Sequence, residues 1–379
     1  MPYIVKPIVS GSPAGCPLVF DAHLDLAWNA LEFNRDLRLP LEEIRRRETG
    51  LAGKGRAGST VCFPEMRRGG VGLCVATLLA RYAPHPSRFT GSDRVPCFHS
   101  QEQAWAAAQG QLAWYREMED GGELTPIRTG AELDAQIARW SNDALRPAES
   151  LPIGYLLSME NADPLVSWKH LERAYAGGVR AIGPVHYCPG IFGHGTDDEG
   201  PLTPRGRELL VQMRRLGIIL DVTHLCRESF WDALRHFDGP IWASHSNCRT
   251  LADWNRQFDD AQLGALLERD AVIGMALDAV MLVDGFVIGQ SRPADFGLKL
   301  EKVCEHIDHV CQLAGNASHV GIGSDLDGGF GTEQTPTDLD RISDLARIRT
   351  LLAERGFRSE DIERILWGNF VAFLRRVWA

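Results

Sequence analysis

Short runs of apolar residues alternate along the chain with longer segments in which apolar positions recur at the spacing of a helix. Runs of this length between polar loops are typical of buried strands, and the longer amphipathic segments are typical of helices. Eight strands are predicted, at residues 18–25, 71–80, 153–160, 179–186, 217–224, 240–245, 271–278 and 319–325. Helices are predicted to fill most of the gaps, at residues 101–120, 165–176, 205–216, 259–269, 294–314, 337–355 and 359–377.

Two of the predicted helices carry a start signal. Asp163-Pro164 precedes residues 165–176 and Thr203-Pro204 precedes residues 205–216. Each pair combines a capping side chain with a proline suited to the first helical turn. Strands that alternate with helices form right-handed units around a parallel sheet, and eight such units predict a closed (β/α)8 TIM barrel of the α/β class.

A doubly wound open sheet with a cap domain is the competing arrangement. No G-x-G-x-x-G follows a predicted strand into a helix, which removes the main positive sign of that fold. No linker rich in proline, glycine or serine divides the chain, so residues 1–379 are predicted to form a single catalytic barrel domain. Residues around 30–70 and 81–150 are predicted to be elaborated loops with extra helices inserted into that barrel.

Composition and charge narrow the class of protein further. Of the 379 residues, 44% are hydrophobic and 24% are charged, and a formal net charge of −10 argues against a nucleic-acid partner. No run of eighteen apolar residues is present, so no membrane span and no membrane partner are expected. The nine cysteines include no C-x-x-C pair, and the N-terminus lacks the apolar core of a secretory signal, so a cytoplasmic location is expected.

Metal-competent side chains at the ends of six predicted strands are the candidate ligands. In a parallel barrel these ends open onto one face, where such enzymes place their chemistry. Ionisable groups gathered there cost stability unless metal ions or hydrogen bonds satisfy them. The pattern therefore predicts a metal site drawn from His23, Asp25, Glu160, His186, His224, His245 and Asp325.

The number of these side chains points to two metal ions. It exceeds the three protein ligands that a mononuclear catalytic zinc usually takes, and a carboxylate can bridge two cations about 3.5–4 Å apart. Barrel amidohydrolases often use a carbamoylated lysine as the bridge, but no lysine ends any of the eight runs. Glu160 is therefore the predicted bridge.

Six short segments carry a resemblance to a known family. They lie at residues 21–25 (D-x-H-x-D), 201–206 (L-T-x-x-G), 221–224 (D-x-x-H), 244–249 (S-H-S-x-x-R), 321–328 (G-I-G-S-D-x-D-G) and 367–370 (W-G-N-F). Together they resemble the membrane (renal) dipeptidase family of zinc peptidases, family M19, in its soluble microbial type. The resemblance runs almost from end to end and implies a barrel of the metallo-dependent hydrolase type.

The resemblance also implies an activity and a set of metal ligands. The chain would be a zinc-dependent exopeptidase that hydrolyses the peptide bond of small dipeptides, both L-Xaa-L-Xaa and L-Xaa-D-Xaa. His23 and Asp25 would hold the first of two Zn²⁺ ions, and His224 and His245 would hold the second. Glu160 and a water or hydroxide would bridge the two ions.

Three residues would handle the substrate by the same resemblance. His186 would contact the carbonyl region and stabilise the tetrahedral oxyanion. Arg249 would clamp the free carboxylate, because a planar guanidinium binds a carboxylate in two places. Asp325 would engage the bridging water or the substrate amine and move a proton to the leaving group. Family members often dimerise, so a homodimer of this chain is left open.

Two segments depart from the family pattern, and two other functions stay open. Residues 158–162 lack the glycines that commonly flank the family's glutamate, and residues 188–200 form a glycine-rich acidic loop in which His194 is expected to face solvent. A binuclear hydrolase of another small amide, lactone or N-acyl amino acid would keep the metal ligands but would not need Arg249. A non-catalytic binding protein on a degenerate barrel would lack ligands, whereas this chain has each expected one.

Overall fold

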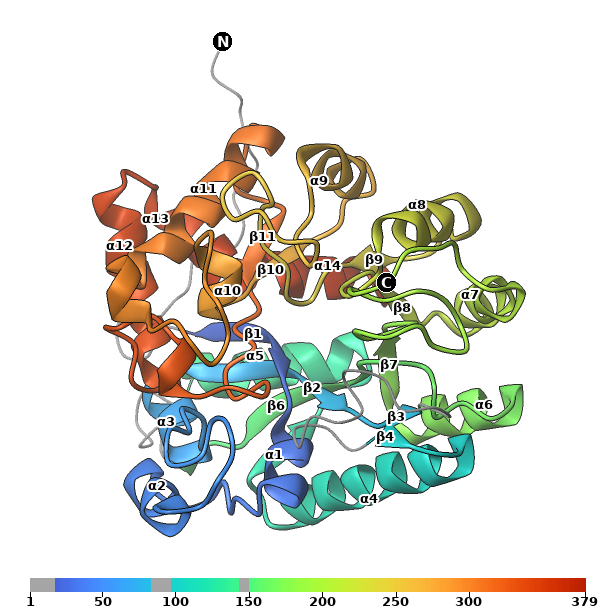
Figure 1. Cartoon of the computed structure of the whole chain (residues 1–379), viewed down its shortest axis with the longest axis horizontal. Coiled ribbons are helices and arrows are strands. Elements are labelled where there is room, and N and C mark those ends of the chain that lie inside the picture. Colours follow the sequence, from blue (N-terminus) through green and yellow to red (C-terminus); the bar gives the residue numbers. More distant parts are fainter. Residues whose placement is uncertain (1–17, 83–96, 143–149) are drawn as a thin grey trace.

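The computed structural model describes residues 18–82, 97–142 and 150–379 (Figure 1). Part of the predicted insertion at 81–150 lies outside the described residues. That residues 1–379 form a single domain stays a prediction.

A ring of eight parallel strands forms the centre of the molecule, and helices surround it (Figure 1). In spatial order the strands are β1 (Val19–Leu24), β2 (Val71–Leu78), β6 (Ile153–Met159), β7 (Val179–Ile182), β8 (Ile219–Asp221), β9 (Ile241–Trp242), β10 (Ile273–Met275) and β11 (Val320–Ile322). β11 pairs again with β1, and a parallel bridge between Ala243 and Ile273 joins β9 to β10. The predicted (β/α)8 barrel is confirmed, and each of the eight predicted runs contains one strand.

Within the described part of the chain, three further strands lie outside this ring. β5 (Leu124–Pro126) pairs in parallel with the first residues of β6, and β3 (Arg81–Tyr82) pairs with β4 (Cys97–Phe98). The same part of the chain contains α4 (Gln101–Asp120), whose bounds match the predicted helix, and α5 (Gly130–Asn142). A capping box at Ser100 fixes the start of α4, because Ser100 and Gln103 each bond the backbone N–H of the other.

The other helices follow the strands along the chain. Those of the first two thirds are α1 (Leu26–Glu32), α2 (Leu41–Glu48), α3 (Phe63–Arg68), α6 (Trp168–Gly177), α7 (Pro204–Leu216), α8 (Arg227–His236) and α9 (Asp260–Leu267). Those of the last third are α10 (Ala279–Leu282), η2 (Pro293–Phe296), α11 (Glu301–Ala314), η3 (Thr332–Gln334), η4 (Ile342–Arg347), α12 (Ile348–Glu354), α13 (Ser359–Glu363), η5 (Arg364–Gly368) and α14 (Asn369–Val377). Helices α2, α3 and α5 lie in the two regions where extra helices were predicted without bounds, whereas α1, α8 and α10 were not predicted.

Three predicted helix boundaries are wrong. The helix predicted at 165–176 begins at Trp168, because Asp163 does not cap it and instead accepts the N–H of Ile191 in the next loop at 3.1 Å. The helix predicted at 294–314 is interrupted at Gly297, whose φ of 59° ends η2. The helix predicted at 337–355 begins only at η4. The Thr203 cap is confirmed, since its hydroxyl accepts the N–H of Gly206 at 3.0 Å.

The barrel strands are buried on both faces, as expected for a parallel sheet covered by helices. Two glycines permit a close approach where β9, β10 and β11 meet. A Cβ atom on Gly274 or Gly323 would lie within 2 Å of the carbonyl oxygen of Ser244, so neither position can hold a larger residue without moving the backbone. The absence of a side chain at both positions lets the backbone after β9 pack directly against β10 and against the residue that follows β11.

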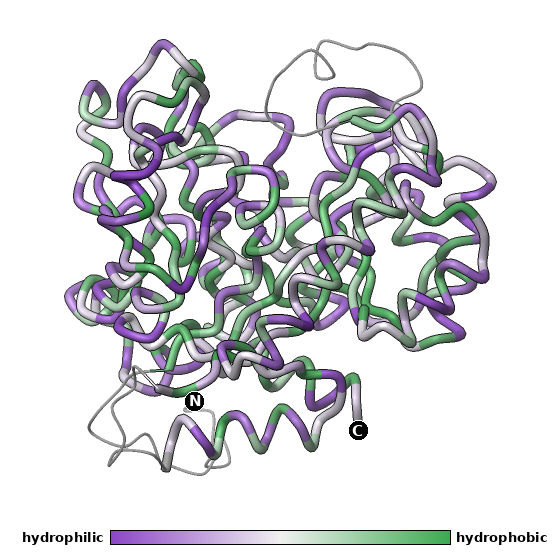
Figure 2. Tube along the Cα trace, turned by 90° about the horizontal axis from the view of Figure 1, so that it is seen from below, coloured by the Kyte–Doolittle hydropathy of each residue, from purple (hydrophilic) through white to green (hydrophobic). Residues whose placement is uncertain are grey.

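Helices cover the barrel with alternating polar and apolar stretches, and the tube coloured by hydropathy shows this alternation along the outer segments (Figure 2). On α14 the ring of Phe370 lies 5.2 Å from that of Phe20 and 5.8 Å from that of Trp242, so the C-terminal helix packs on two barrel strands. Among the described residues, no helix has both the length and the apolar character needed to cross a bilayer.

Candidate metal centre

Four imidazoles surround one carboxylate oxygen at the C-terminal ends of the barrel strands. The Oε1 atom of Glu160, just after β6, lies 3.5 Å from His23 Nε2, 3.3 Å from His186 Nε2, 3.3 Å from His224 Nε2 and 3.7 Å from His245 Nε2. His23 is the second-last residue of β1, and His186, His224 and His245 follow β7, β8 and β9. The structure thus brings together residues that are up to 222 positions apart in the sequence (23 to 245).

Two aspartates complete the group. His23 Nε2 lies 3.8 Å from Asp25 Oδ1 and 3.8 Å from Asp325 Oδ1. Asp25 is buried, whereas the side chain of Asp325 retains 16% of its exposure. All seven residues predicted at strand ends therefore lie in one cluster.

Metal ions fit this cluster by the geometry of its donor atoms. Ligand atoms within 4.8 Å of one another form three overlapping groups: His23, Glu160 and His245; Glu160, His186 and His224; and His23, Asp25 and Asp325. Among the described residues, His23 Nε2, His245 Nε2 and Glu160 Oε2 are buried without a hydrogen-bond partner. Buried polar atoms without partners are costly, and a bound cation would satisfy these three.

The pKa values of the cluster reflect burial and a concentration of negative charge. Burial opposes the ionisation of Glu160, but His186 and His23 outweigh it and hold the pKa of Glu160 well below its ordinary value. Burial lowers the pKa of His23, but Glu160, Asp25 and Asp325 outweigh it and raise that pKa to about 10. The acidic groups thus draw positive charge to this point, and a cation bound there would displace the His23 proton.

His224 and His245 have the opposite character. Burial holds the pKa of each imidazole well below its ordinary value, and the nearby charge of Arg256 lowers both further. Both rings are therefore neutral at physiological pH, which is the state that binds metal ions. Burial also raises the pKa of Asp325 well above its ordinary value, and the neighbouring carboxylates of Asp25 and Glu160 raise it further.

Hydroxyl groups orient three of the candidate ligands. Thr196 Oγ1 lies 3.0 Å from His224 Nδ1, and Ser244 Oγ lies 2.8 Å from His245 Nδ1. Thr77 donates its hydroxyl hydrogen to Asp25 Oδ1. A partner on Nδ1 leaves Nε2 of each histidine directed toward Glu160, as metal ligands commonly require. These three hydroxyl residues were not predicted, because none of them ends a strand as a recognisable ligand.

Two buried aspartates bond the strand ends to each other. Asp21 accepts the N–H of His23 at 3.2 Å and the N–H of Ser324 at 2.8 Å. Asp221 accepts the N–H groups of Thr223 and Ser244, each at 3.1 Å. Asp21 thus joins the end of β1 to Ser324, which precedes Asp325. Asp221 joins the end of β8 to Ser244, which precedes His245. This explains the first aspartate of the D-x-H-x-D and D-x-x-H segments.

Two candidate residues adopt a backbone conformation that is unfavourable for their side chains. His224 has a φ of 69° and Asp325 a φ of 57°, both in the left-handed region. Residues other than glycine occupy this region at a cost, and such positions concentrate at functional sites. A sequence pattern of strands and helices gives no sign of this.

The structure does not bring Arg249 into the cluster. Its Nε donates to Asp253 Oδ1 at 2.8 Å, and its side chain is 38% exposed. Arg256 was not predicted, yet it is buried next to the cluster, where its Nη2 donates to the carbonyl oxygen of His245 at 2.7 Å. Its Nε atom is buried without a partner among the described residues. Arg256 lies in an irregular loop with no periodic pattern that could have indicated its position.

The loop at 188–200 supports the cluster from outside. His194 binds Asp198, with 2.6 Å between Nδ1 and Oδ2, and its side chain is 30% exposed, so it is not among the clustered imidazoles. Gly200 closes the loop against α8, because its carbonyl oxygen accepts the hydroxyl hydrogen of Ser229 at 2.7 Å. Thr196 of this loop is the residue that contacts His224, which gives the loop a structural role.

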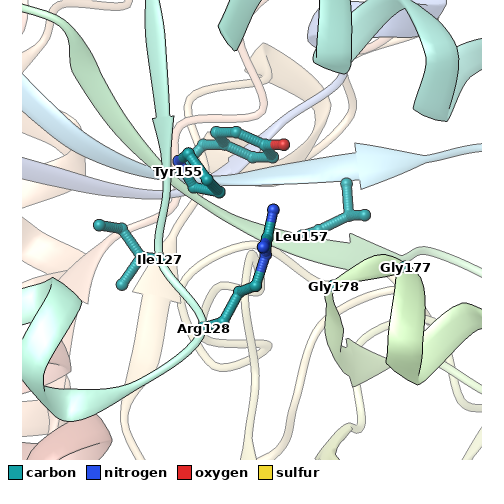
Figure 3. Close-up of a pocket in the computed structure, with 7 residues that line it drawn as sticks. Ile127, Arg128, Tyr155, Leu157, Gly177 and Gly178 are labelled. Atoms are coloured by element: carbon teal, nitrogen blue, oxygen red, sulfur yellow. The ribbon is translucent and has the colours of Figure 1, made fainter.

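A small hollow elsewhere on the molecule is lined by none of the candidate metal ligands. It is a shallow surface hollow lined by Pro126, Ile127, Arg128, Tyr155, Leu157, Gly177 and Gly178. Figure 3 shows Arg128 reaching across it toward Tyr155 and Leu157 of β6. The hydroxyl of Tyr155 donates to Glu119 of α4, so this region is the packing of helices against the outside of the barrel.

Comparison with known proteins agrees with this architecture. The profile of the membrane dipeptidase family, peptidase family M19, matches residues 16–379. A protein from the pqqA 5′ region of Klebsiella pneumoniae is 32% identical over 219 residues, which are 55% of this chain and 76% of that protein. An uncharacterized dipeptidase of Schizosaccharomyces pombe is 29% identical over 212 residues, 55% of this chain and 48% of that protein. This match thus spans about half the length of the fungal relative.

Two crystal structures of metallopeptidases, the first of them from family M19, superpose on nearly the whole chain. Dipeptidase AC gives a TM-score of 0.75 at 25% identity, over 95% of this chain and 98% of that one. A metallopeptidase from Rhodobacter sphaeroides, bound to a phosphinate mimic of the dipeptide L-Ala-D-Ala, gives 0.73 at 25% identity, over 96% and 100% of the two chains.

Fold and strand-end cluster together define a hydrolase of the metal-dependent barrel class. The family profile makes this assignment narrower. The chain belongs to the membrane dipeptidase family, peptidase family M19, and is a metallodipeptidase.

Proposed function

We propose that this protein hydrolyses the peptide bond of small dipeptides at a centre of two zinc ions. The observation that supports this most directly is the arrangement around Glu160, where four imidazoles converge on one carboxylate and three ligand atoms are buried without partners. Family membership supports a dipeptide as the substrate.

His23 and Asp25 would hold one ion, His224 and His245 the other, and Glu160 would be shared between them. Zn²⁺ suits this mixture of imidazole and carboxylate ligands. When bound, the two ions would lower the pKa of a shared water and polarise the scissile carbonyl group.

Two residues beside the ligands would act on the reacting atoms. Burial lowers the pKa of His186, so its imidazole is predominantly neutral at physiological pH and can donate a hydrogen bond to the developing oxyanion. Asp325 retains some exposure and faces the cluster, which suits a carboxyl group that takes a proton from water and returns it to the leaving amine. Asp325 would also bind the free amine of the substrate.

Arg249 and Arg256 are the two candidates for the residue that binds the substrate's carboxylate. Arg256 is favoured, because it is buried beside His245 and has a buried N–H group without a partner. Arg249 is already paired with Asp253 at the surface. A pocket that binds both the amine and the carboxylate of a substrate would admit a dipeptide and exclude longer peptides.

A D-residue on the C-terminal side of the substrate is part of the proposal. The structural relative from Rhodobacter sphaeroides binds a mimic of L-Ala-D-Ala and is 25% identical to this chain over nearly its whole length. We therefore infer that both L,L and L,D dipeptides are cleaved.

The test is hydrolysis of a panel of L,L and L,D dipeptides by zinc-reconstituted protein, beside a chelator-treated sample and a sample reloaded with zinc. Activity that disappears with chelation and returns with zinc supports the metallodipeptidase, and the ratio of rates defines the stereochemical preference. Absence of cleavage by protein that carries two zinc ions would contradict the proposal. It would direct the search to another small amide, a lactone or an N-acyl amino acid.

A further inference from the structure

Strand β2 carries none of the predicted metal ligands, but it lies between β1 and β6, which end directly before Asp25 and Glu160. The spatial order is β1, β2, β6. Its last residues contact both ligands: the hydroxyl of Thr77 donates to Asp25 Oδ1, and the carbonyl oxygen of Leu78 accepts the N–H of Glu160 at 3.2 Å. The end of β2 therefore contacts both ligands and sets the distance between them.

Beyond Ala76, β2 has no strand partner on the side of β1. The paired register between the two strands ends with Leu24 opposite Ala76. The backbone groups that follow would lack partners there, and buried backbone groups without partners are strongly unfavourable. Another part of the chain must therefore satisfy them.

Helix α4 satisfies these backbone groups with two side chains. Gln111 accepts the N–H of Leu79 at 2.8 Å and donates to the carbonyl oxygen of Leu79 at 2.7 Å, as a neighbouring strand would. Tyr115 donates to the carbonyl oxygen of Thr77 at 2.9 Å. Gln111 and Tyr115 are four residues apart, so they lie on the same face of the helix. Both are buried, as is Thr77.

The hydroxyl of Tyr115 also reaches the first turn of α1, which begins directly after Asp25. It accepts the N–H of Ala27, two residues after Asp25, at 3.3 Å. One phenol group thus holds the backbone on both sides of the contact between Thr77 and Asp25. A carboxylate that accepts a hydrogen bond on one oxygen is restricted in its rotation, which directs its remaining lone pairs.

We propose that Thr77 is a positioning residue for Asp25, and that Gln111 and Tyr115 of α4 hold Thr77 in place. The inference deepens the proposed function and rests on Asp25 as a ligand of the first metal ion. It assigns α4, which lies between the barrel strands β2 and β6 in the chain, to the geometry of one metal site. The second site, at His224 and His245, depends on other hydroxyl groups and should be independent of Thr77.

The test is a titration of metal-free protein with Co²⁺ or Zn²⁺, with wild type compared to Thr77→Val and Thr77→Ser. Valine keeps the shape of threonine without the hydroxyl, and serine restores the hydroxyl. We expect Thr77→Val to weaken one of the two binding events about 10- to 100-fold, as for other outer-shell partners, and to change the Co²⁺ spectrum of that event. The other event should change by less than about threefold on the same scale. Thr77→Ser should restore the affinity.

Two further variants keep the test decisive. Thr125→Val is the matched control, because the hydroxyl of Thr125 on β5 accepts from Arg139 at 3.3 Å instead of bonding a candidate ligand. Tyr115→Phe should weaken the same binding event as Thr77→Val, by a smaller factor, even if Thr77→Val folds poorly. Wild-type affinity at both sites in Thr77→Val and Tyr115→Phe, or an equal loss at both sites, would overturn the inference. A wild-type protein that binds two ions but cleaves no dipeptide would instead contradict the proposed function and leave this inference standing.

Discussion

Asp21 and Ser324 join the first and last strands of the barrel through a single carboxylate. Asp21 accepts the N–H of Ser324 at 2.8 Å and its hydroxyl hydrogen at 2.5 Å, and burial raises the pKa of Asp21 to about 6. Ser324 directly precedes Asp325, so this contact fixes the backbone that presents a candidate proton carrier.

Replacing this carboxylate should affect both folding and activity. Asp21→Ala leaves two buried N–H groups and a hydroxyl without an acceptor, at about 1–3 kcal/mol for each unsatisfied group. We expect a clear decrease in the free energy of unfolding and a lower kcat, measured by urea unfolding and by dipeptide hydrolysis. Asp21→Asn keeps one acceptor oxygen and should lose less of both. Equal losses in the two variants would contradict this role.

Glu160→Gln tests the centre of the cluster. The amide is nearly isosteric but carries no charge, so the four surrounding imidazoles lose their common anionic partner. Bound zinc should fall well below the wild-type content, and kcat/KM should fall at least about 100-fold, the upper range for changes beside metal ligands. Glu119→Gln, at the outer face of the barrel, is the matched control and should keep its zinc. Full zinc content in Glu160→Gln would argue against a bridging role.

The two arginines can be separated by conservative substitution. Arg256→Lys keeps the charge but removes the planar fork, and should raise KM for dipeptides about 10- to 100-fold, the equivalent of one charge-assisted hydrogen bond. Arg249→Lys, at the surface, should leave KM within about twofold on the same scale. Michaelis constants for both variants decide the question. The reverse pattern would restore Arg249 as the carboxylate clamp.

Asp325 combines a left-handed backbone conformation, with a φ of 57°, with a proposed role in proton transfer, and two substitutions can separate these properties. Asparagine tolerates the left-handed region better than most residues and alanine does not. Asp325→Asn should therefore keep the melting temperature within a few degrees while kcat falls by two or more orders of magnitude, roughly the size of a lost general acid–base contribution. Asp325→Ala should lose stability as well. Retained activity in Asp325→Asn would exclude the proposed proton transfer.

Asp163 should make the stability of the protein depend on pH. Burial raises its pKa from 3.8 to about 6, although the N–H of Ile191 and the charge of Arg81 oppose this. The folded state therefore binds its proton more tightly than the unfolded state, and this contribution to stability is present below about pH 4 and is lost as the pH rises through about 6. Asp163→Asn should be more stable than wild type at pH 7–8, by up to about 3 kcal/mol, and should lose that advantage near pH 4.

Urea unfolding of both proteins between pH 4 and pH 8 measures this difference. Asp134→Asn is the control, because Asp134 is exposed and paired with Arg375 at the surface. Parallel curves for wild type and Asp163→Asn across the whole range would show that Asp163 titrates in the same way in the folded and unfolded states.

The sequence predicts the barrel well because its strands are short, apolar and separated by helices. Each predicted run contains a strand, and the side chains at the run ends meet in one cluster because parallel strands share a direction. Their individual roles at the metal ions stay predictions. The prediction of one continuous helix at 294–314 was wrong, because Gly297 turns the backbone at a point where the apolar pattern continues.

The parts that sequence reasoning missed come from loops and from helix faces. Arg256 and Thr196 reach the cluster from irregular segments, whose path depends on packing rather than on a periodic pattern. Gln111 and Tyr115 read as an ordinary buried face of α4, and only the structure shows that they bond β2. Hydrogen bonds between distant segments leave no local trace in a sequence.

The left-handed backbone at His224 and Asp325 limits how far this protein can be engineered for heat resistance. A glycine at either position would relieve the conformational cost, of order 1–3 kcal/mol, but it would delete an imidazole or a carboxyl group from the cluster. Computational redesign that scores backbone fit alone would select these two substitutions and would produce a thermally stable but inactive enzyme. Thermostabilisation should therefore begin at the outer helices and leave the strand ends unchanged.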